Sequence, residues 1–235
     1  MRIDLRIAPS RLAGIALAGL VLTARAAPAE DRPAAWANDF TARLEALALL
    51  QTLNAELLSH DSATLTLDRW CDTHHLASPA KVIAVRDRGA SKPATAELRR
   101  ALGVGEAEPI RYRRVQLVCG RHVLSEADNW YVPSRLTPEM NHQLDTTDIA
   151  FGRAVQALHF QRRTLSAQLL WSPLPDGWDT GGGALPDASA PALAIPHAVL
   201  EHRAVLTLPD GTPISQVIET YTEQVLAFPQ PRPIR

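Results

Sequence analysis

The sequence lacks the charge imbalance and the metal-ligand motifs that identify many protein classes. With 24 Lys and Arg against 25 Asp and Glu, its formal net charge is −1, so no overall field attracts nucleic acid or an anionic membrane. It has only two cysteines and no Cys-x-x-Cys pair, and two cysteines do not make a zinc site. The Gly181–Gly183 run lacks the lysine and helix of a phosphate-binding loop and reads as a flexible lid or a plain linker. We expect no metal and no nucleic-acid partner.

Long apolar runs are absent beyond the N-terminus. There, an apolar run from Leu12 to Thr23 follows three arginines and precedes small residues around Ala26 and Ala29. This order is typical of a secretory signal peptide, and about a dozen apolar residues are too few to span a bilayer comfortably. We expect residues 1–29 to be a signal peptide and the protein to be periplasmic or secreted, with no stable membrane span after cleavage. An uncleaved anchor is one alternative, and a misplaced start codon, which would leave the protein cytoplasmic, is another.

The scarcity of cysteine leaves one pairing to consider. Cys71 and Cys119 could form a disulfide in an oxidising compartment. They could equally be two buried free thiols that behave as small apolar groups. The sequence leaves both alternatives open.

The remaining residues, 30–235, are enough for one domain with a sizeable core. Leucines at three- and four-residue steps predict a helix over 37–59, and further short helices are expected near 66–74, 95–102, 137–144 and 151–158. Strands are expected at 81–86, 161–171 and in two hairpins, 111–133 and 198–228. Helices first and strand pairs later indicate an α+β fold, an antiparallel sheet of about six strands with helices on one face. We expect the protein to be a monomer.

The first hairpin carries the most informative charges. Its opening strand, Arg111–Cys119, has three arginines in four residues. Because side chains alternate along a strand, Arg111 and Arg113 share one face while Arg114 points to the other. One of these faces should be the core, and a buried arginine needs an anion.

The order of several short motifs resembles the chorismate lyase family, whose fold is shared with ligand-sensing domains of some bacterial transcription regulators. The similar segments are 60–64, Arg114–Cys119, Phe151–Arg153 and Gly211-x-Pro213 followed by Glu219. Together they span most of the chain after the leader. In this family the lyase cleaves chorismate to 4-hydroxybenzoate and pyruvate, a step of ubiquinone biosynthesis, without metal or organic cofactor.

The resemblance implies where a ligand would bind. Arg114 would hold the ring carboxylate, and Glu219 would take the 4-hydroxyl end and move a proton, which makes both of them candidate catalytic residues. Asn129, Ala63 and Phe151 would line the pocket. The lyases have a second arginine where this chain has Asn129, and Arg163 or Arg162 is a candidate replacement. Arg153 is interpreted as structural.

Two functions follow from this resemblance. The protein could be a lyase acting on a small aromatic or cyclohexadienyl carboxylate. It could instead be an exported binding protein of the same fold that holds a small anion without turning it over. Both hypotheses require Arg114 and Glu219 to point into one cavity.

Overall fold

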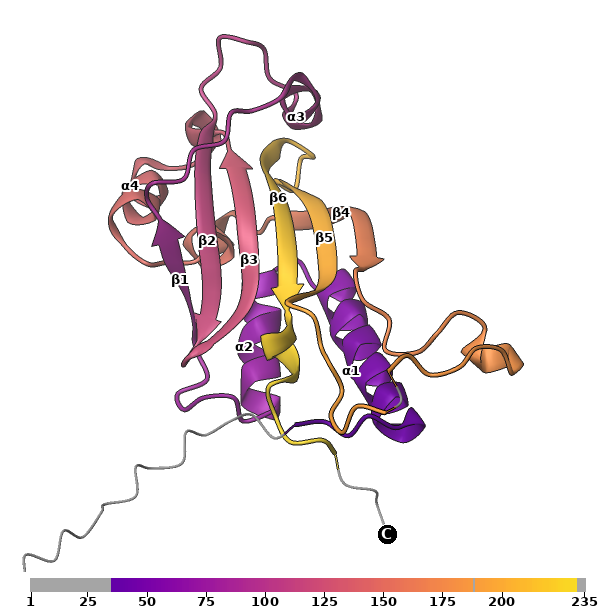
Figure 1. Ribbon diagram of the computed structural model, residues 1–235. Coiled ribbons are helices and arrows are strands. Elements are labelled where there is room, and N and C mark those ends of the chain that lie inside the picture. The colour runs from indigo at the N-terminus through magenta and orange to yellow at the C-terminus, as the bar shows by residue number, and fades with distance from the viewer. Residues whose placement is uncertain (1–34, 188, 232–235) are drawn as a thin grey trace, which may run out of the picture. The chain divides into compact units, whose positions relative to one another are not determined.

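A computed structural model describes residues 35–187 and 189–231, so the expected signal peptide, residues 1–29, lies outside the described residues. A six-stranded antiparallel sheet has the strand order β1-β2-β3-β6-β5-β4 (Figure 1). The strands are β1 (Val82–Asp87), β2 (Arg111–Cys119), β3 (His122–Tyr131), β4 (Gln161–Leu169), β5 (Ala198–Thr207) and β6 (Pro213–Thr222). The α+β class and the six-stranded antiparallel sheet expected from the sequence are confirmed.

Most helices pack on one face of the sheet, which we call the inner face. It carries α1 (Phe40–Ser59), α2 (Ala63–Thr73), α4 (Pro138–Thr146) and α5 (Phe151–Ala154). Leucines of α1 and α2 pack with Val115, Leu117 and Val217 of the sheet in one core cluster. Val115 and Leu117 belong to the alternating apolar set of β2, so the sequence pattern selects this face.

Local capping explains where the helices begin. The side chain of Asp39 accepts from Ala42 N at the start of α1, and that of Ser62 accepts from Leu65 N at the start of α2. Thr137 caps α4 and precedes Pro138 in its first turn, as the sequence indicates. Helix α2 begins a few residues earlier than expected, because Ser62 provides a cap that the pattern analysis did not use.

One helix departs from the expected arrangement. Helix α3 (Ala96–Leu102) packs with Tyr112, Trp130 and Ile218. These side chains alternate with the inner set, so α3 covers part of the opposite, outer face. The expectation that all helices lie on one face is therefore wrong for α3. Its apolar side covers Trp130, which would otherwise be exposed to solvent.

A disulfide joins Cys71 of α2 to Cys119 at the end of β2, and both residues are fully buried. Of the two alternatives, a disulfide or two buried free thiols, the structure shows the disulfide. The bond fixes the C-terminal half of α2 to the sheet across 48 residues of sequence. Closing a loop of this length restricts the unfolded chain.

The long segment between β4 and β5 is anchored at its ends. Buried Arg43 of α1 donates to Pro173 O and to Pro186 O, both at 2.6 Å. This places the segment beside the start of α1, and none of its described residues lines the pocket presented below. Of the two interpretations of Gly181–Gly183, the flexible lid is therefore wrong. The segment is a linker that is tethered to α1. Within the described residues, no helix has the length and apolarity needed to cross a membrane.

Candidate functional site

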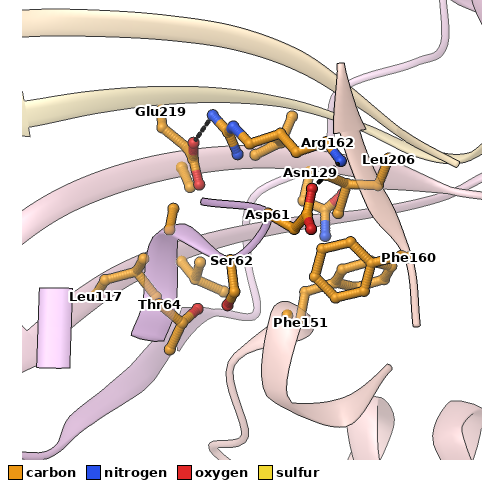
Figure 2. A pocket seen from close by; sticks show the side chains of 15 residues that line it. Asp61, Ser62, Thr64, Leu117, Asn129, Phe151, Phe160, Arg162, Leu206 and Glu219 are labelled. Carbon is orange, nitrogen blue, oxygen red and sulfur yellow. Dashed lines mark hydrogen bonds and ion pairs between the residues drawn. The ribbon is translucent and has the colours of Figure 1, made fainter. Parts of the chain in front are cut away.

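A pocket lies on the inner face, between the sheet and the N-terminal ends of α2 and α5 (Figure 2). It encloses about 450 Å³, including the part that opens to solvent. Its floor consists of apolar side chains from β2, β3 and β6, and Phe151 and Phe160 form part of its wall. Its polar lining residues are Asp61, Ser62, Thr64, Asn129, Arg162 and Glu219.

A buried ion pair crosses the pocket floor. Arg162 Nη2 of β4 and a carboxylate oxygen of Glu219 of β6 lie 2.6 Å apart, and their side chains are 3% and 7% exposed. Strand β5 lies between these two strands, and its register places Leu206 beside Arg162 and His202 beside Glu219. Burial works to lower the pKa of Arg162, but the Glu219 carboxylate outweighs it and the pKa is raised. The tyrosine hydroxyl of Tyr221 also donates to Glu219 at 3.2 Å.

A buried histidine lies next to this pair. His202 is fully buried, and its Nε2 is 2.8 Å from Asn54 Oδ1 of α1. Because the amide oxygen accepts, Nε2 carries the proton in the neutral ring. Burial lowers the pKa of His202 to about 4, nearby Glu219 opposes this shift, and Arg162 adds to it. The ring is therefore neutral at pH 7.

Hydrogen-bond donors of the pocket lie at the start of α2 and on β3. The backbone N–H groups of Ala63 and Thr64 are the first two of α2, which cannot bond within a helix, and neither bonds to any described residue. Asn129 is 4% exposed, and the hydroxyl of Ser215 donates to its Oδ1. This bond fixes the amide so that Nδ2, which has no partner among the described residues, remains available to the pocket.

Gly152 allows α5 to approach the start of α2. A Cβ at this position would lie 2.9 Å from Ser62 Oγ and 3.5 Å from Thr64 Oγ1, so a larger residue would separate the two pocket walls. Arg153 forms an ion pair with Asp68 of α2 and donates to Val82 O. These contacts join α5, α2 and β1, which agrees with the structural role expected for Arg153.

Four of the expected site residues line this pocket: Glu219, Asn129, Ala63 and Phe151. Arg114 does not. It pairs with Asp128, which lies across from it in β3, and with Glu126 on the same outer face. Its side chain is 43% exposed. The expectation that Arg114 and Glu219 share a cavity is wrong, because they project from opposite faces of the sheet.

The prediction that Arg163 lines the pocket is wrong for the same reason. It is exposed and pairs in register with Val205, whereas Arg162 pairs with Leu206, which lines the pocket. Of the two candidate replacements for the family's second arginine, only Arg162 faces the pocket. Sequence analysis left this choice open, and the alternation of β4 alone could not resolve it.

The inward-facing arginine of the first hairpin is Arg113, which is 2% exposed. Its guanidinium donates to Ile149 O at 3.2 Å, and it does not line the pocket. Burial, together with nearby Arg86 and Arg88, lowers its pKa to about 10. The alternation of side chains along β2 indicates that Arg113 faces the core, since it shares a face with Val115, Leu117 and Cys119.

Sequence reasoning also missed Phe160, Gly152 and the capping segment Asp61–Ser62 as parts of the pocket. The side chain of Asp61 accepts from the backbone N–H of Arg162 at 2.8 Å. This contact ties the start of α2 to the start of β4. Among the described residues, no group of three or more His, Cys, Asp or Glu side chains is placed to hold a metal ion.

No protein-family model matches the chain. Among solved structures, PhnF from Mycobacterium smegmatis is similar with a TM-score of 0.44 and 13% identity, over 76% of this chain and 71% of PhnF. YydK from Bacillus subtilis, described as a possible transcriptional regulator, has a TM-score of 0.36 and 17% identity over 60% of this chain. The match covers 58% of YydK, which is less than two thirds of its length.

A protein from Sinorhizobium fredii (strain NBRC 101917 / NGR234) is far more similar. The uncharacterized protein y4mC is 54% identical over 225 residues, which cover 94% of each chain. Identity at this level over nearly the whole length shows common descent. The chain belongs to the same family as y4mC.

Proposed function

We propose that the pocket binds a small organic anion with an aromatic or cyclohexadienyl ring, as the resemblance to chorismate lyase implies. One observation carries this proposal. The N–H groups of Ala63 and Thr64 and the amide of Asn129 are donors without partners among the described residues, in a pocket that also has apolar side chains of the sheet and two phenylalanine rings in its lining. A helix N-terminus favours a negative charge, and the apolar walls suit a ring.

The charges of the lining residues support a ligand with one negative charge. The lining arginine, Arg162, is already paired with Glu219, and Asp61 adds a second carboxylate near the mouth. A second carboxylate on the ligand would therefore meet two acids and no unpaired cation among the lining residues, which is unfavourable in a buried site. A ligand hydroxyl, in contrast, could donate to Glu219. We expect 4-hydroxybenzoate to bind more tightly than the dianion chorismate.

Lyase activity is the second candidate function. It is favoured by Glu219, an acid that lines the pocket and could move a proton. Incubation with chorismate followed by a pyruvate assay tests it directly. Pyruvate formed above the uncatalysed background, and lost in Glu219→Gln, would support catalysis. The absence of pyruvate would leave the binding function.

The location of the protein is part of the same proposal. The N-terminal pattern of residues 1–29 predicts export, and the Cys71–Cys119 disulfide supports it, because such bonds persist in oxidising compartments. Sequencing the N-terminus of the protein recovered from its host tests this. A mature chain that retains Met1 would contradict it.

Calorimetry with 4-hydroxybenzoate tests the binding function. Asn129→Asp keeps the size and the bond to Ser215 but replaces the donor by a negative acceptor, and should weaken binding at least about tenfold. Arg114→Ala is the matched control, since Arg114 lies on the outer face, and should leave the affinity unchanged. Absence of binding to the unaltered protein at millimolar ligand would refute the proposal.

A further inference from the structure

The two edge strands of the sheet differ in how they are protected. Strand β1 includes Arg86 and Asp87 and follows Lys81, and the N–H of Ala84 on its free edge donates to Asp148 O at 3.0 Å. Strand β4 is the other edge (Figure 1). On its outer side, the hydrogen bond seen among the described residues is the one from Arg162 N to Asp61, at the beginning of the strand. The rest of the β4 edge is open.

The open edge has no charge. The stretch Thr164–Leu170 reads TLSAQLL and is followed by five more uncharged residues. Leu165 and Leu170 are 45% and 43% exposed. A bulge between Thr164 and Ser166 leaves Leu165 without a partner in β5 and leaves Ser166–Leu169 as regular strand. Natural proteins protect an exposed edge with charges, proline, a bulge or a covering segment, because an open edge pairs with other strands. The bulge at Leu165 precedes Ser166–Leu169, which contains no charge and no proline.

Helix α1 extends this apolar surface. Asn54 contacts His202 of β5, and His202 is in register with Ala167 of β4, so this side of α1 faces β5, the strand next to the β4 edge. Leu47 and Leu58 lie seven residues before and four residues after Asn54, and therefore on the same side of the helix. Leu58 is 48% exposed.

We propose that the β4 edge is a dimer interface at which two copies of this chain pair antiparallel across a twofold axis, extending the sheet from one copy into the other. Such an interface must be self-complementary. A twofold axis at Gln168 pairs Ser166 with Leu170 and Ala167 with Leu169 of the second copy, so no like charges face each other. The Arg162–Arg163 pairs lie at opposite ends of the interface, roughly 33 to 40 Å apart at strand spacing. A dimer, rather than the monomer expected from the sequence, explains why this edge needs no charged residues.

Analytical ultracentrifugation of the full-length chain, as its host processes it, measures the oligomeric state and so tests the interface. We expect a dimer for the unaltered protein. Gln168→Lys places two lysines opposite each other at the axis and should weaken the dimer at least about a hundredfold. Val85→Lys introduces the same charge on the other edge strand, at a residue 45% exposed, and should leave the dimer intact.

Mixing two variants tests the register. Gln168→Glu alone should also be monomeric, and an equimolar mixture of Gln168→Glu with Gln168→Lys should recover the dimer, because opposite charges then meet at the axis. A monomeric unaltered protein overturns the proposal. So does a dimer whose stability Gln168→Lys and Gln168→Glu leave unchanged, or one that Val85→Lys dissociates.

Discussion

The two faces of the sheet each carry an arginine between carboxylates, yet the two clusters differ in burial and in partners. On the inner face, Arg162 and Glu219 are almost fully buried and lie 2.6 Å apart. On the outer face, Arg114 is 43% exposed and shares Glu126 and Asp128 at 3.2 and 3.3 Å. Exposed pairs are screened by water and contribute little, whereas a buried charge depends on its partner. The same residue types therefore have a solvated role on one face and build a pocket floor on the other.

The largest expected effect comes from breaking the inner pair. Glu219→Ala leaves the guanidinium of Arg162 buried without its carboxylate, and should lower the free energy of unfolding by about 3 to 5 kcal/mol. Denaturant unfolding measures this. Glu126→Ala on the outer face is the control and should cost under about 1 kcal/mol. Equal costs for the two variants would mean that burial does not distinguish the faces.

The next effect concerns the covalent bond that holds α2 to the inner face. Replacing both Cys71 and Cys119 by alanine should lower the free energy of unfolding by about 3 kcal/mol, since the unfolded chain gains the freedom of the opened loop. The measurement is again denaturant unfolding, with and without reductant. Reductant should destabilise the unaltered protein and have no effect on the double variant. If both respond alike, the disulfide does not contribute to stability.

The pH dependence of stability should also separate the faces. The pKa of His202 is lowered to about 4, below its unfolded value of about 6.5. The unfolded state therefore binds the proton first, and stability falls as the pH drops from about 6.5 to 4, by about 2 kcal/mol at pH 5. His202→Gln should reduce this slope, and half-buried His74, whose pKa is also lowered, should account for part of what remains.

An outer-face acid provides the control for this titration. Burial works to raise the pKa of Asp128, but hydrogen bonds from Tyr112 and Lys92 outweigh it and hold the pKa below its usual value. Its contribution is therefore present above about pH 4 and is lost only at lower pH. Asp128→Asn should leave the slope between pH 6.5 and 5 unchanged, and a loss of the slope in this variant would reassign the titration to the outer face.

The smallest effect is expected at Arg114. Because its side chain is partly exposed and its partners can be solvated, Arg114→Ala should change the free energy of unfolding by under about 1 kcal/mol, with a smaller change in high salt. Denaturant unfolding at two ionic strengths measures this. A loss of several kcal/mol would show that the outer cluster is as interdependent as the inner pair.

Much of the fold could be predicted because its signals are local. The cap at Thr137, the left-handed Gly103 after α3 and the turn at Gly120 each act within a few residues, and each lies at an element boundary. The site was only partly predictable. Glu219, Asn129, Ala63 and Phe151 were placed in the pocket by resemblance, but the resemblance also gave a ligand-binding role to Arg114, which lies on the outer face.

The sequence by itself determined the strands, the caps and the alternation that puts Arg113 and Arg114 on opposite faces. Tertiary structure decided which arginine meets Glu219. Arg162 and Glu219 are 57 residues apart, and they meet only because β5 lies between their strands in a particular register. Strand alternation fixes relative sides within one strand, but the pairing of distant strands depends on the packing of the whole sheet against α1 and α2.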